Sequence, residues 1–528
     1  KMATKEQNLE SMSMLNQIST NPSTPKNIRN RKIIFWEDQG FLQYSIAFWL
    51  QKKLDYKMYA IVDTTDRTKT FFQNQKQINF QKIWFLHDNI LKNKKPDLNY
   101  LKSIEKKYNL NIWQIAANER IFYGFYNFHE FTEDEVLSII EQECKLYEKI
   151  LDELKPDFVS ITTNTHQNHL FLKLCQAKRI RILFLTGSRV AGRAMISHDM
   201  DTFPEPLDTT PMTKELSFTE LQNIQKKINL FNETKDYVEG FSDSKIDLIK
   251  AATQYLFFSD NNTAKTNYNY FGRTKSKVLI DSISNKVKIQ NRTKFIEKNF
   301  TKKIHYDNFI FFPLQLEPER TLLIDAPFFT NQLEIIRNIS KSLPIGYKLL
   351  VKEHAAMITR SWRDINWYEE LMKIPNVILV HPSVTPDEIL SKCSLVITIT
   401  GTAGLDAAYY NKPSIVFSDV LYSRLSSVIL IKNISELPST IRIALNKQVD
   451  LHELNNFLNL IEKNSFEFKW NTFASSTHKF LFYKGNLLDV DISDTQVKSF
   501  LEANENTLLP LINEYIKRIN QYNELDCN

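Results

Sequence analysis

The sequence is poor in glycine, in cysteine and in long apolar runs, and each shortage excludes a class of protein. Only 10 of its 528 residues are glycine and 4 are cysteine. The cysteines lie far apart, so they lack the spacing of metal ligands and fit a reducing compartment. No run approaches the roughly 18 apolar residues of a membrane span. The polar N-terminus has no apolar segment of signal-peptide length. We therefore expect a soluble protein of the cytoplasm.

The motifs of several enzyme classes are missing as well. There is no GxxxxGK[ST] segment, which excludes ordinary P-loop chemistry. The motifs GxSxG, HExxH and paired CxxC do not occur, so the hydrolases and zinc sites that they mark are not indicated. No GxGxxG follows the first predicted strand, which argues against a dinucleotide-dependent oxidoreductase.

Neither sign of charge is in large excess. The 67 lysines and arginines are interspersed with 61 aspartates and glutamates, and the net charge is +6. Such a spread does not indicate nucleic-acid binding, so we expect no nucleic-acid partner. It is compatible with a weak peripheral contact to an anionic membrane surface.

Short apolar strands alternate with helical patterns in two separate stretches of the chain. The first set of predicted strands lies at 32–36, 58–62, 82–86, 158–161 and 182–185, and the second at 308–313, 347–351, 376–380, 395–399, 414–417 and 428–431. This alternation predicts an α/β fold with a parallel, doubly wound sheet in each stretch. Two such domains would face a central cleft between the carboxyl ends of their strands, where ligands bind.

Changes in composition predict the domain boundaries. The predicted parts are a flexible tail at 1–30, a Rossmann-like domain at 31–204, a helical inter-domain region at 205–305, a second Rossmann-like domain at 306–465, and C-terminal helices at 466–528 that pack back toward the first domain. The inter-domain region is rich in Lys, Asn and Thr, and within it only 277–280 resembles a strand.

A turn of small residues follows the strand at 395–399 and precedes a helical pattern. It consists of Thr400, Gly401, Thr402, Ala403 and Gly404. Free backbone N–H groups and the positive end of the helix dipole converge at such a turn, which suits a phosphate. A turn that needs small residues for packing alone is the alternative. Asp406, in the first helical turn, either accepts ribose hydroxyls or only interacts with the dipole.

Three polar residues follow the strand at 347–351, namely Lys352, Glu353 and His354. A cation, a carboxylate and an imidazole at a carboxyl strand end predict a site for a phosphate and a nucleoside, and a solvated loop is the alternative.

Other polar residues near these strand ends have two interpretations each. Gln315 ends the first strand of the second domain and can donate to and accept from a base or a sugar. A purely structural role in the turn is equally consistent with the sequence. Arg360 and Arg363 could add charge for a phosphate, but we interpret them as exposed helix arginines.

The first domain offers candidates for acid–base chemistry. Glu37 and Asp38 end its first strand, and a carboxylate at a cleft can remove a proton from an attacking hydroxyl. A helix cap is the alternative role for the acidic pair. His166 could replace the pair as the base, and Arg189 and Arg193 could hold an acceptor or another anionic group.

Taken together, three motifs of the second domain resemble one protein family. They are FFPLQLEPE (311–319), KEH (352–354) and TITGTAGLDAA (398–408), the last followed by KPSIVF. In order and spacing they are similar to the capsular polysaccharide biosynthesis family that includes the Kdo-transferring capsule enzymes. Those enzymes are glycosyltransferases of the two-Rossmann GT-B architecture. For the first domain, the resemblance extends only to the general architecture.

The resemblance implies a transferase that needs neither metal nor cofactor. Its second domain would bind a nucleotide-sugar donor and its first domain the acceptor. His354, Thr400 and Thr402 would hold the donor phosphate, and the pair Glu37 and Asp38 would supply the base.

Two departures from the family pattern concern the donor and the base. His354 is followed by Ala355 rather than by proline, and Gln39 separates the acidic pair from Gly40. The first departure leaves UDP- and GDP-sugars open, although CMP-Kdo or a related CMP-sugar is favoured. The second leaves the identity of the base open.

We therefore predict a glycosyltransferase that moves a sugar from a nucleotide-activated donor to a hydroxyl of a glycan or glycolipid acceptor. It would act in surface polysaccharide or glycoconjugate synthesis, in the cytoplasm or peripherally at the inner face of the membrane. A nucleotide-sugar 2-epimerase, which shares the double-Rossmann shape, and a non-catalytic sugar-nucleotide-binding protein are the alternatives.

Overall fold

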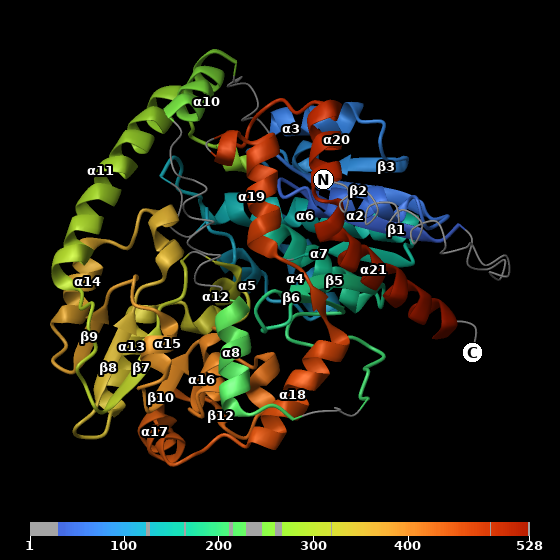
Figure 1. The fold of residues 1–528 in the computed structure, drawn as a ribbon. Helices are drawn as coiled ribbons and strands as arrows, with labels where there is room; N and C mark the ends of the chain where they lie inside the picture. Colours follow the sequence, from blue (N-terminus) through green and yellow to red (C-terminus); the bar gives the residue numbers. More distant parts are fainter. Residues whose placement is uncertain are drawn as a thin grey trace, which may run out of the picture.

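The computed structural model describes residues 30–122, 127–162, 165–210, 215–228, 245–258, 267–317, 319–485 and 487–525. These residues form two β-sheets (Figure 1). Each sheet separates two hydrophobic cores, one on either face. The predicted α/β fold with two doubly wound, Rossmann-like domains is confirmed.

The N-terminal sheet has the strand order β13-β6-β5-β4-β1-β2-β3. Its strands are β1 (Lys32–Asp38), β2 (Lys57–Asp63), β3 (Phe80–Phe85), β4 (Phe158–Ile161), β5 (Arg181–Gly187), β6 (Arg193–Ser197) and β13 (Phe466–Glu467). Strands β1 to β5 pair in parallel, whereas β6 runs antiparallel to β5 and β13 antiparallel to β6. Strands β6 and β13 were not predicted. Strand β13 has only two residues and comes from a distant part of the chain.

The C-terminal sheet has the order β12-β11-β10-β7-β8-β9 and is parallel throughout. Its strands are β7 (Phe309–Pro313), β8 (Lys348–Lys352), β9 (Val377–Val380), β10 (Leu395–Thr398), β11 (Ser414–Val416) and β12 (Val428–Leu430). In both sheets the strand order reverses beside the first strand, between β1 and β4 and between β7 and β10. Loops diverge at such a reversal, so ligands bind at the carboxyl edge there.

Strand β1 shows why these segments are apolar throughout. Ile33 and Phe35 pack in one core, and Ile34 and Trp36 pack in the core on the opposite face. Successive side chains of a strand alternate between faces, so a strand covered on both sides has no polar face.

The helices fall into four groups along the chain. The first domain has α2 (Leu42–Leu50), α3 (Asp66–Asn74), η2 (Leu86–Asn89), α4 (Leu98–Tyr108), α5 (Ile112–Ala117), α6 (Glu133–Leu154) and α7 (His166–Ala177). The inter-domain region has α8 (Phe218–Ile228), α10 (Lys245–Phe258), η4 (Tyr268–Tyr270) and α11 (Lys275–Asn299). The second domain has α12 (Arg320–Leu323), η5 (Pro327–Phe329), α13 (Gln332–Ser342), η6 (Ala355–Arg360), α14 (Ile365–Met372), α15 (Pro386–Leu390), α16 (Ala403–Tyr409), η7 (Leu421–Arg424), η8 (Ile434–Glu436), α17 (Leu437–Leu445) and α18 (Leu451–Asn464). The C-terminal group has α19 (Trp470–Leu481), η9 (Tyr483–Gly485), α20 (Asp494–Ala503) and α21 (Glu505–Leu525).

None of the helices in these described ranges is long and apolar enough to cross a membrane.

Helix α11 corrects one detail of the sequence prediction. The strand-like segment 277–280 lies inside this helix, which Thr274 caps by accepting from the N–H of Lys277 (3.2 Å). A short apolar run cannot by itself distinguish a strand from part of a helix. The C-terminal end of α11 packs on the second domain through Ile296 and Phe300.

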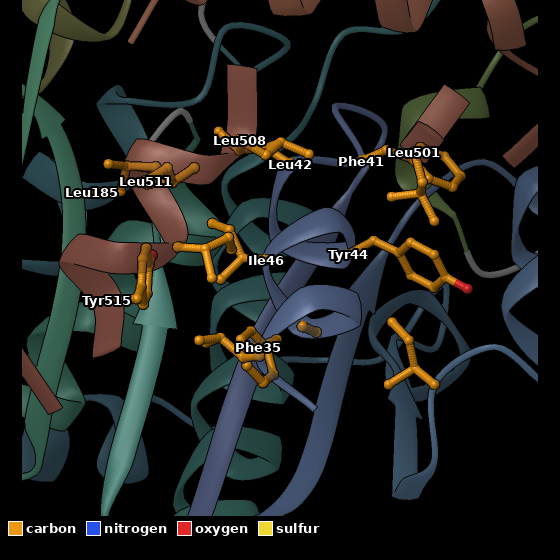
Figure 2. Packing of buried hydrophobic residues seen from close by; sticks show 14 of the residues in the cluster. Phe35, Phe41, Leu42, Tyr44, Ile46, Leu185, Leu501, Leu508, Leu511 and Tyr515 are labelled. Atoms are coloured by element: carbon orange, nitrogen blue, oxygen red, sulfur yellow. The ribbon is translucent and has the colours of Figure 1, made fainter. Parts of the chain in front are cut away.

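The C-terminal helices return to the first domain. Leu501, Leu508, Leu511 and Tyr515 share one core with residues of β1, α2 and β5 (Figure 2). The Tyr515 hydroxyl lies 2.9 Å from Ser160 Oγ at the centre of the sheet. The last segment of the chain is therefore part of the first domain's core.

Candidate functional site

Gln315 connects the ends of β7 and β10, where the C-terminal sheet reverses its strand order. In the orientation that satisfies both amide atoms, its side-chain oxygen accepts from the N–H groups of Thr400 (2.6 Å) and Gly401 (3.0 Å). Two of the turn's N–H groups, predicted to bind a phosphate, are therefore bonded to Gln315. Gln315 is a buried turn support, as the structural alternative proposed.

The glycines of the turn are explained by close packing. A Cβ at Gly401 would lie 2.7 Å from Thr398 Oγ1, and a Cβ at Gly404 would lie 2.6 Å from the Tyr422 hydroxyl. Thr398 also accepts from the Gly401 N–H (3.1 Å), and the Tyr422 hydroxyl donates to the Gly401 carbonyl. Small residues are needed here whether or not a ligand binds.

Thr402 and Ala403 begin α16, and the Thr402 side chain does not cap it. The helix has seven residues, so its dipole is smaller than that of a long helix. Asp406 lies against α8, where Gln225 donates a hydrogen bond to it. Burial raises the pKa of Asp406 to about 7, and this hydrogen bond opposes the shift. The contact with α8 argues against the predicted role of Asp406 in binding ribose.

Glu353 is buried and fully engaged within the protein. One carboxylate oxygen accepts from the His354 N–H (2.7 Å), and the other accepts from Arg363 Nε (3.0 Å) and from the Tyr368 hydroxyl (2.6 Å). The prediction that Glu353 contacts the donor directly does not fit these bonds. Glu353 instead fixes the backbone at His354.

Arg363 is the residue that the sequence interpretation misplaced. It is 5% exposed, not an exposed helix arginine. Besides Glu353 it contacts Glu317, and its Nη2 donates to the Gln315 carbonyl (2.6 Å). Arg363 therefore joins all three motifs, since Gln315 in turn holds Thr400. A lone arginine in a loop gave no signal of this role.

Lys352 and His354 carry the kinds of group that suit an anionic ligand. Lys352 ends β8 and is mostly buried, which lowers its pKa to about 8, while Glu353 opposes the shift. His354 Nδ1 accepts from the Ala356 N–H (3.2 Å), so its proton is on Nε2. Burial lowers the pKa of His354, although Glu319 and Glu353 oppose this, so the ring is neutral at pH 7. Among the described residues none bonds to His354 Nε2.

Glu37 and Asp38 end β1, at the reversal point of the N-terminal sheet, and have different environments. Glu37 is fully buried, and both its oxygens lack a hydrogen-bond partner within the described structure. Burial, with Asp38, raises the pKa of Glu37 well above 4.5. A neutral carboxyl in the core cannot act as the predicted base.

Asp38 has the properties that a base requires. It is half-buried, and burial raises its pKa to about 6. A hydrogen bond from the Gly40 N–H (2.7 Å) lowers this pKa, and Asp63, its register partner on β2, raises it. Asp63 accepts from His87 Nε2 (2.9 Å). Asp63 and His87 were not predicted to support Asp38, because their contacts depend on the pairing of separate strands.

His166 is not available as an alternative base. It is fully buried between two carboxylates, with Nδ1 2.7 Å from Glu119 and Nε2 2.9 Å from Glu143. Burial alone would lower the pKa of His166, but Glu143 and Glu119 raise it to about 10. The ring is therefore charged at pH 7 and links the two carboxylates structurally.

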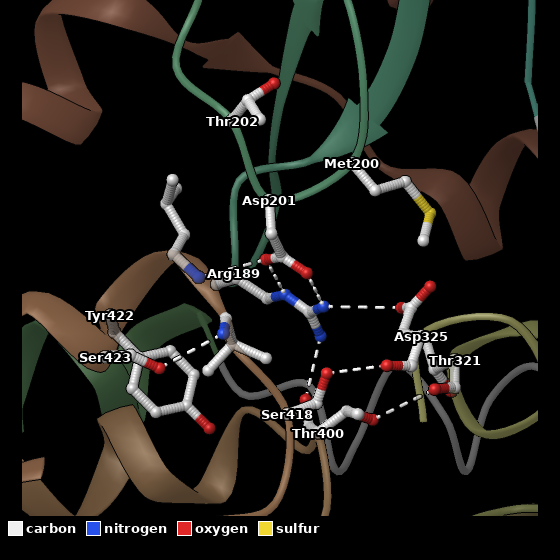
Figure 3. Close-up of polar contacts among 12 residues, drawn as sticks. Arg189, Met200, Asp201, Thr202, Thr321, Asp325, Thr400, Ser418, Tyr422 and Ser423 are labelled. Atoms are coloured by element: carbon white, nitrogen blue, oxygen red, sulfur yellow. Dashed lines mark hydrogen bonds and ion pairs between the residues drawn. The ribbon is translucent and has the colours of Figure 1, made fainter. Parts of the chain in front are cut away.

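Arg189 connects the two domains and does not hold an external anion. Its Nε donates to Asp201 (2.7 Å), and Nη1 donates across the domain boundary to the Thr400 carbonyl (2.8 Å) (Figure 3). Nη2 lies 3.5 Å from Asp325. Burial would lower the pKa of Arg189, but Asp201 and Asp325 raise it. With two carboxylates beside it, the guanidinium charge is already balanced.

Arg193, the other predicted anion contact, is also used within the protein. Its Nε donates to Ser465 Oγ (2.8 Å), and Nη2 donates to the carbonyls of Glu462 and Ser465 (3.0 Å each). It therefore joins β6 to the end of α18. Of the predicted site residues, Asp38, Lys352 and His354 keep the properties of groups that act on a ligand.

The fold and the site define a protein with two Rossmann-like domains whose carboxyl edges meet at Arg189 and Thr400. Residues 225–425 match the model of the family described as capsule polysaccharide biosynthesis protein. This range contains all three motifs, so the predicted resemblance to that family is confirmed.

Several solved structures are similar to the chain at low identity. The UDP-GlcNAc 2-epimerase of Methanocaldococcus jannaschii, in complex with UDP-GlcNAc and UDP, is 12% identical over 82% of this chain and 99% of that one, with a TM-score of 0.27. The Neisseria meningitidis enzyme bound to UDP-GlcNAc is 13% identical over 82% and 97%, with a TM-score of 0.28. Thermosulfurimonas dismutans KpsC, a beta Kdo 2,7 transferase, is 12% identical over 66% and 87%, with a TM-score of 0.28. No curated protein matches the chain.

Proposed function

We propose that this chain is a glycosyltransferase that moves a sugar from a nucleotide-activated donor to an acceptor hydroxyl in surface polysaccharide or glycoconjugate synthesis. The match to the capsule family over residues 225–425 supports this class. The observation that carries the proposal is the network of Arg363, which brings Gln315, Glu353 and, through Gln315, Thr400 to one point of the sheet edge.

In this proposal the donor phosphate binds at Lys352 and His354. The Lys352 ammonium supplies positive charge where negative charge develops on the leaving nucleotide. The neutral His354 donates one hydrogen bond from Nε2. The Glu353–Arg363 pair acts only by fixing the backbone that carries Lys352 and His354. Because Lys352 supplies the charge, we propose transfer without a metal. Within the described residues no group of three or more His, Cys, Asp or Glu side chains could hold one.

The acceptor hydroxyl then attacks the anomeric carbon of the donor sugar. The new carbon–oxygen bond forms as the bond to the phosphate oxygen breaks, and that electron pair leaves with the nucleotide. The hydroxyl proton passes to Asp38, whose pKa of about 6 keeps it ionised at pH 7. A CMP-sugar such as CMP-Kdo is the favoured donor because of the family resemblance, and UDP- and GDP-sugars are the alternatives.

Nucleotide binding tests the donor site. We expect CMP to raise the melting temperature of the full chain more than UDP or GDP. Lys352→Met should weaken CMP binding about tenfold to hundredfold, the value of a hydrogen bond to a charged group. The matched control is Lys348→Met, at the other end of β8, where Nζ donates to the Pro375 carbonyl (3.2 Å). Equal CMP affinity in Lys352→Met and Lys348→Met would contradict the proposed site.

The same preparations separate transfer from epimerisation. A transferase gives a glycosylated product only when an acceptor is added, whereas a 2-epimerase converts the donor by itself. Conversion of a nucleotide-sugar to its 2-epimer without acceptor would overturn the proposed reaction and leave the donor site intact. Nucleotide binding with neither product would favour a binding protein.

A further inference from the structure

Helix α11 carries aliphatic side chains on the side that faces away from the protein. Ile280, Ile283 and Val287 are 67%, 65% and 52% exposed. Their spacing of three and four residues puts them on one face of the helix. Of the 25 residues of α11, only Ile296 is fully buried. An exposed apolar stripe on a helix that packs so little is a mark of an interaction surface.

Helix α10, which contacts α11, also carries exposed apolar side chains. Its Ile246, Ile249 and Phe257 are 65%, 64% and 76% exposed. The two helices are joined where Lys275 Nζ of α11 donates to the Leu256 carbonyl of α10 (2.5 Å). Both lie at one outer edge of the molecule, drawn in green at the upper left of Figure 1. We call the exposed aliphatic and aromatic residues of α10 and α11 the outer apolar face.

Lysines flank the apolar stripe of α11 on both sides. With about 3.6 residues per turn, Lys277 and Lys288 lie along one side of it and Lys275 and Lys286 along the other. Lys294, also exposed, continues the stripe itself.

Acidic side chains are few on this part of α11. Asp281 is half-buried and accepts from Asn127 (3.0 Å) and Asn285 (2.9 Å). Glu297 lies near the C-terminal end of the helix, where it contacts Lys302 and His381. The rim of the stripe is therefore basic.

We propose that the outer apolar face docks on the surface of an anionic lipid bilayer. Aliphatic and aromatic side chains flanked by lysines are the combination that binds at the headgroup boundary, because the apolar groups insert and the ammonium groups meet lipid phosphates. A second copy of this chain fits less well, since its equally basic rim would repel the first. This inference goes beyond the proposed sugar transfer, and its test needs no catalysis.

Vesicle binding tests the docking surface. The full chain should co-sediment with vesicles of phosphatidylcholine and phosphatidylglycerol, but much less with phosphatidylcholine alone, and added salt should release it. The triple variant Lys277→Glu, Lys288→Glu and Lys294→Glu should bind at least about a hundredfold more weakly, since each lysine near an anionic surface contributes about fivefold. The triple variant Ile280→Ser, Ile283→Ser and Val287→Ser should lose at least about tenfold.

The matched control removes equally exposed aliphatic residues from the second domain. Ile345 and Ile443 are 105% and 57% exposed, and the double variant Ile345→Ser and Ile443→Ser should bind like the wild type. Because all the changed residues are exposed, the melting temperatures of the variants should equal that of the wild type. If the apolar triple variant does not fold, the vesicle binding of the lysine triple variant tests the proposal. Equal binding by the lysine variant and the control would overturn the proposal. A wild-type dimer in sedimentation velocity that is absent in the apolar triple variant would also overturn the proposal.

Discussion

Both sheets carry a buried glutamate at the carboxyl end of a strand, but the two glutamates have opposite surroundings. Glu353, after β8, bonds to Arg363, Tyr368 and the His354 N–H. Glu37, at the end of β1, has no hydrogen-bond partner among the described residues, and its pKa is raised. The first is a charged anchor for a binding loop, whereas the second is a neutral group within the core.

This difference teaches that position at a strand end does not define a residue's role. Burial without a partner favours the neutral form of a carboxyl group, and burial with an arginine favours the charged form. Asp38 has a third environment, half-buried beside Asp63, which leaves it able to exchange a proton near neutral pH.

The largest effect is expected from the substitution of Asp38, the proposed base. Asp38→Asn should lower the turnover number about 100- to 10,000-fold and leave CMP affinity unchanged. In the wild type, activity should fall as the pH drops through about 6, because Asp38 becomes protonated. It should fall again above about 8, where Lys352 loses its proton.

The control for this variant is Asp88→Asn, an exposed carboxylate after β3 that pairs with Lys69 (2.5 Å). It should keep full activity. An Asp38→Asn enzyme with normal turnover would remove Asp38 from the mechanism, and turnover would then be compared with that of Glu37→Gln.

The next largest effect is expected on stability, from the substitution of Glu353. Glu353→Met should lower the free energy of unfolding by about 3 kcal/mol, because it leaves Arg363 Nε and the Tyr368 hydroxyl buried without their carboxylate acceptor, although Glu317 still pairs with Arg363. Urea unfolding of the full chain measures the change. The double variant Glu353→Met and Arg363→Met should recover part of the loss, since it removes both charges. A single variant as stable as the wild type would show that the pair is dispensable.

The smallest effect is expected when Glu37, the buried glutamate of the N-terminal sheet, is replaced by methionine. Its sign is opposite to that of Glu353→Met. Glu37→Met should raise the free energy of unfolding at pH 7 by about 1–3 kcal/mol, because it removes an unsatisfied buried carboxyl group.

The pH dependence of stability checks the cause of this effect. Glu37 binds its proton more tightly in the folded chain than in the unfolded chain. The contribution of this proton to the free energy of unfolding is complete below pH 4.5 and is lost as the pH rises through the raised pKa. The advantage of Glu37→Met should therefore grow with pH. A constant difference between pH 4 and 8 would contradict the raised pKa.

Most strands could be predicted because their signal is local. The segments at 158–161 and 395–399 are apolar on both faces, and the structure has β4 at Phe158–Ile161 and β10 at Leu395–Thr398. Helix α6 also has a local signal, because Thr132 and Glu135 form a capping box at its N-terminus. Strand β13 could not be predicted, because two residues gain a strand conformation only from pairing with β6.

The candidate site was predicted less completely, because its residues act through partners from other elements. The sequence placed Lys352, His354 and Asp38 at strand ends, and their role in binding a ligand stays a prediction. His166 and Arg189 were equally plausible in sequence. The structure surrounds each with carboxylates from other segments, and this neutralises the charge that a ligand would need.

The sequence by itself determined the two α/β domains and the motifs of the second, because strand patterns and turn residues depend on neighbours in the chain. Only the tertiary structure decided which of the polar residues are supports and which can meet a ligand. That choice depends on burial and on charge partners from distant segments, such as Glu119 and Glu143 around His166 or Asp201 and Asp325 around Arg189. A single sequence contains no record of those contacts.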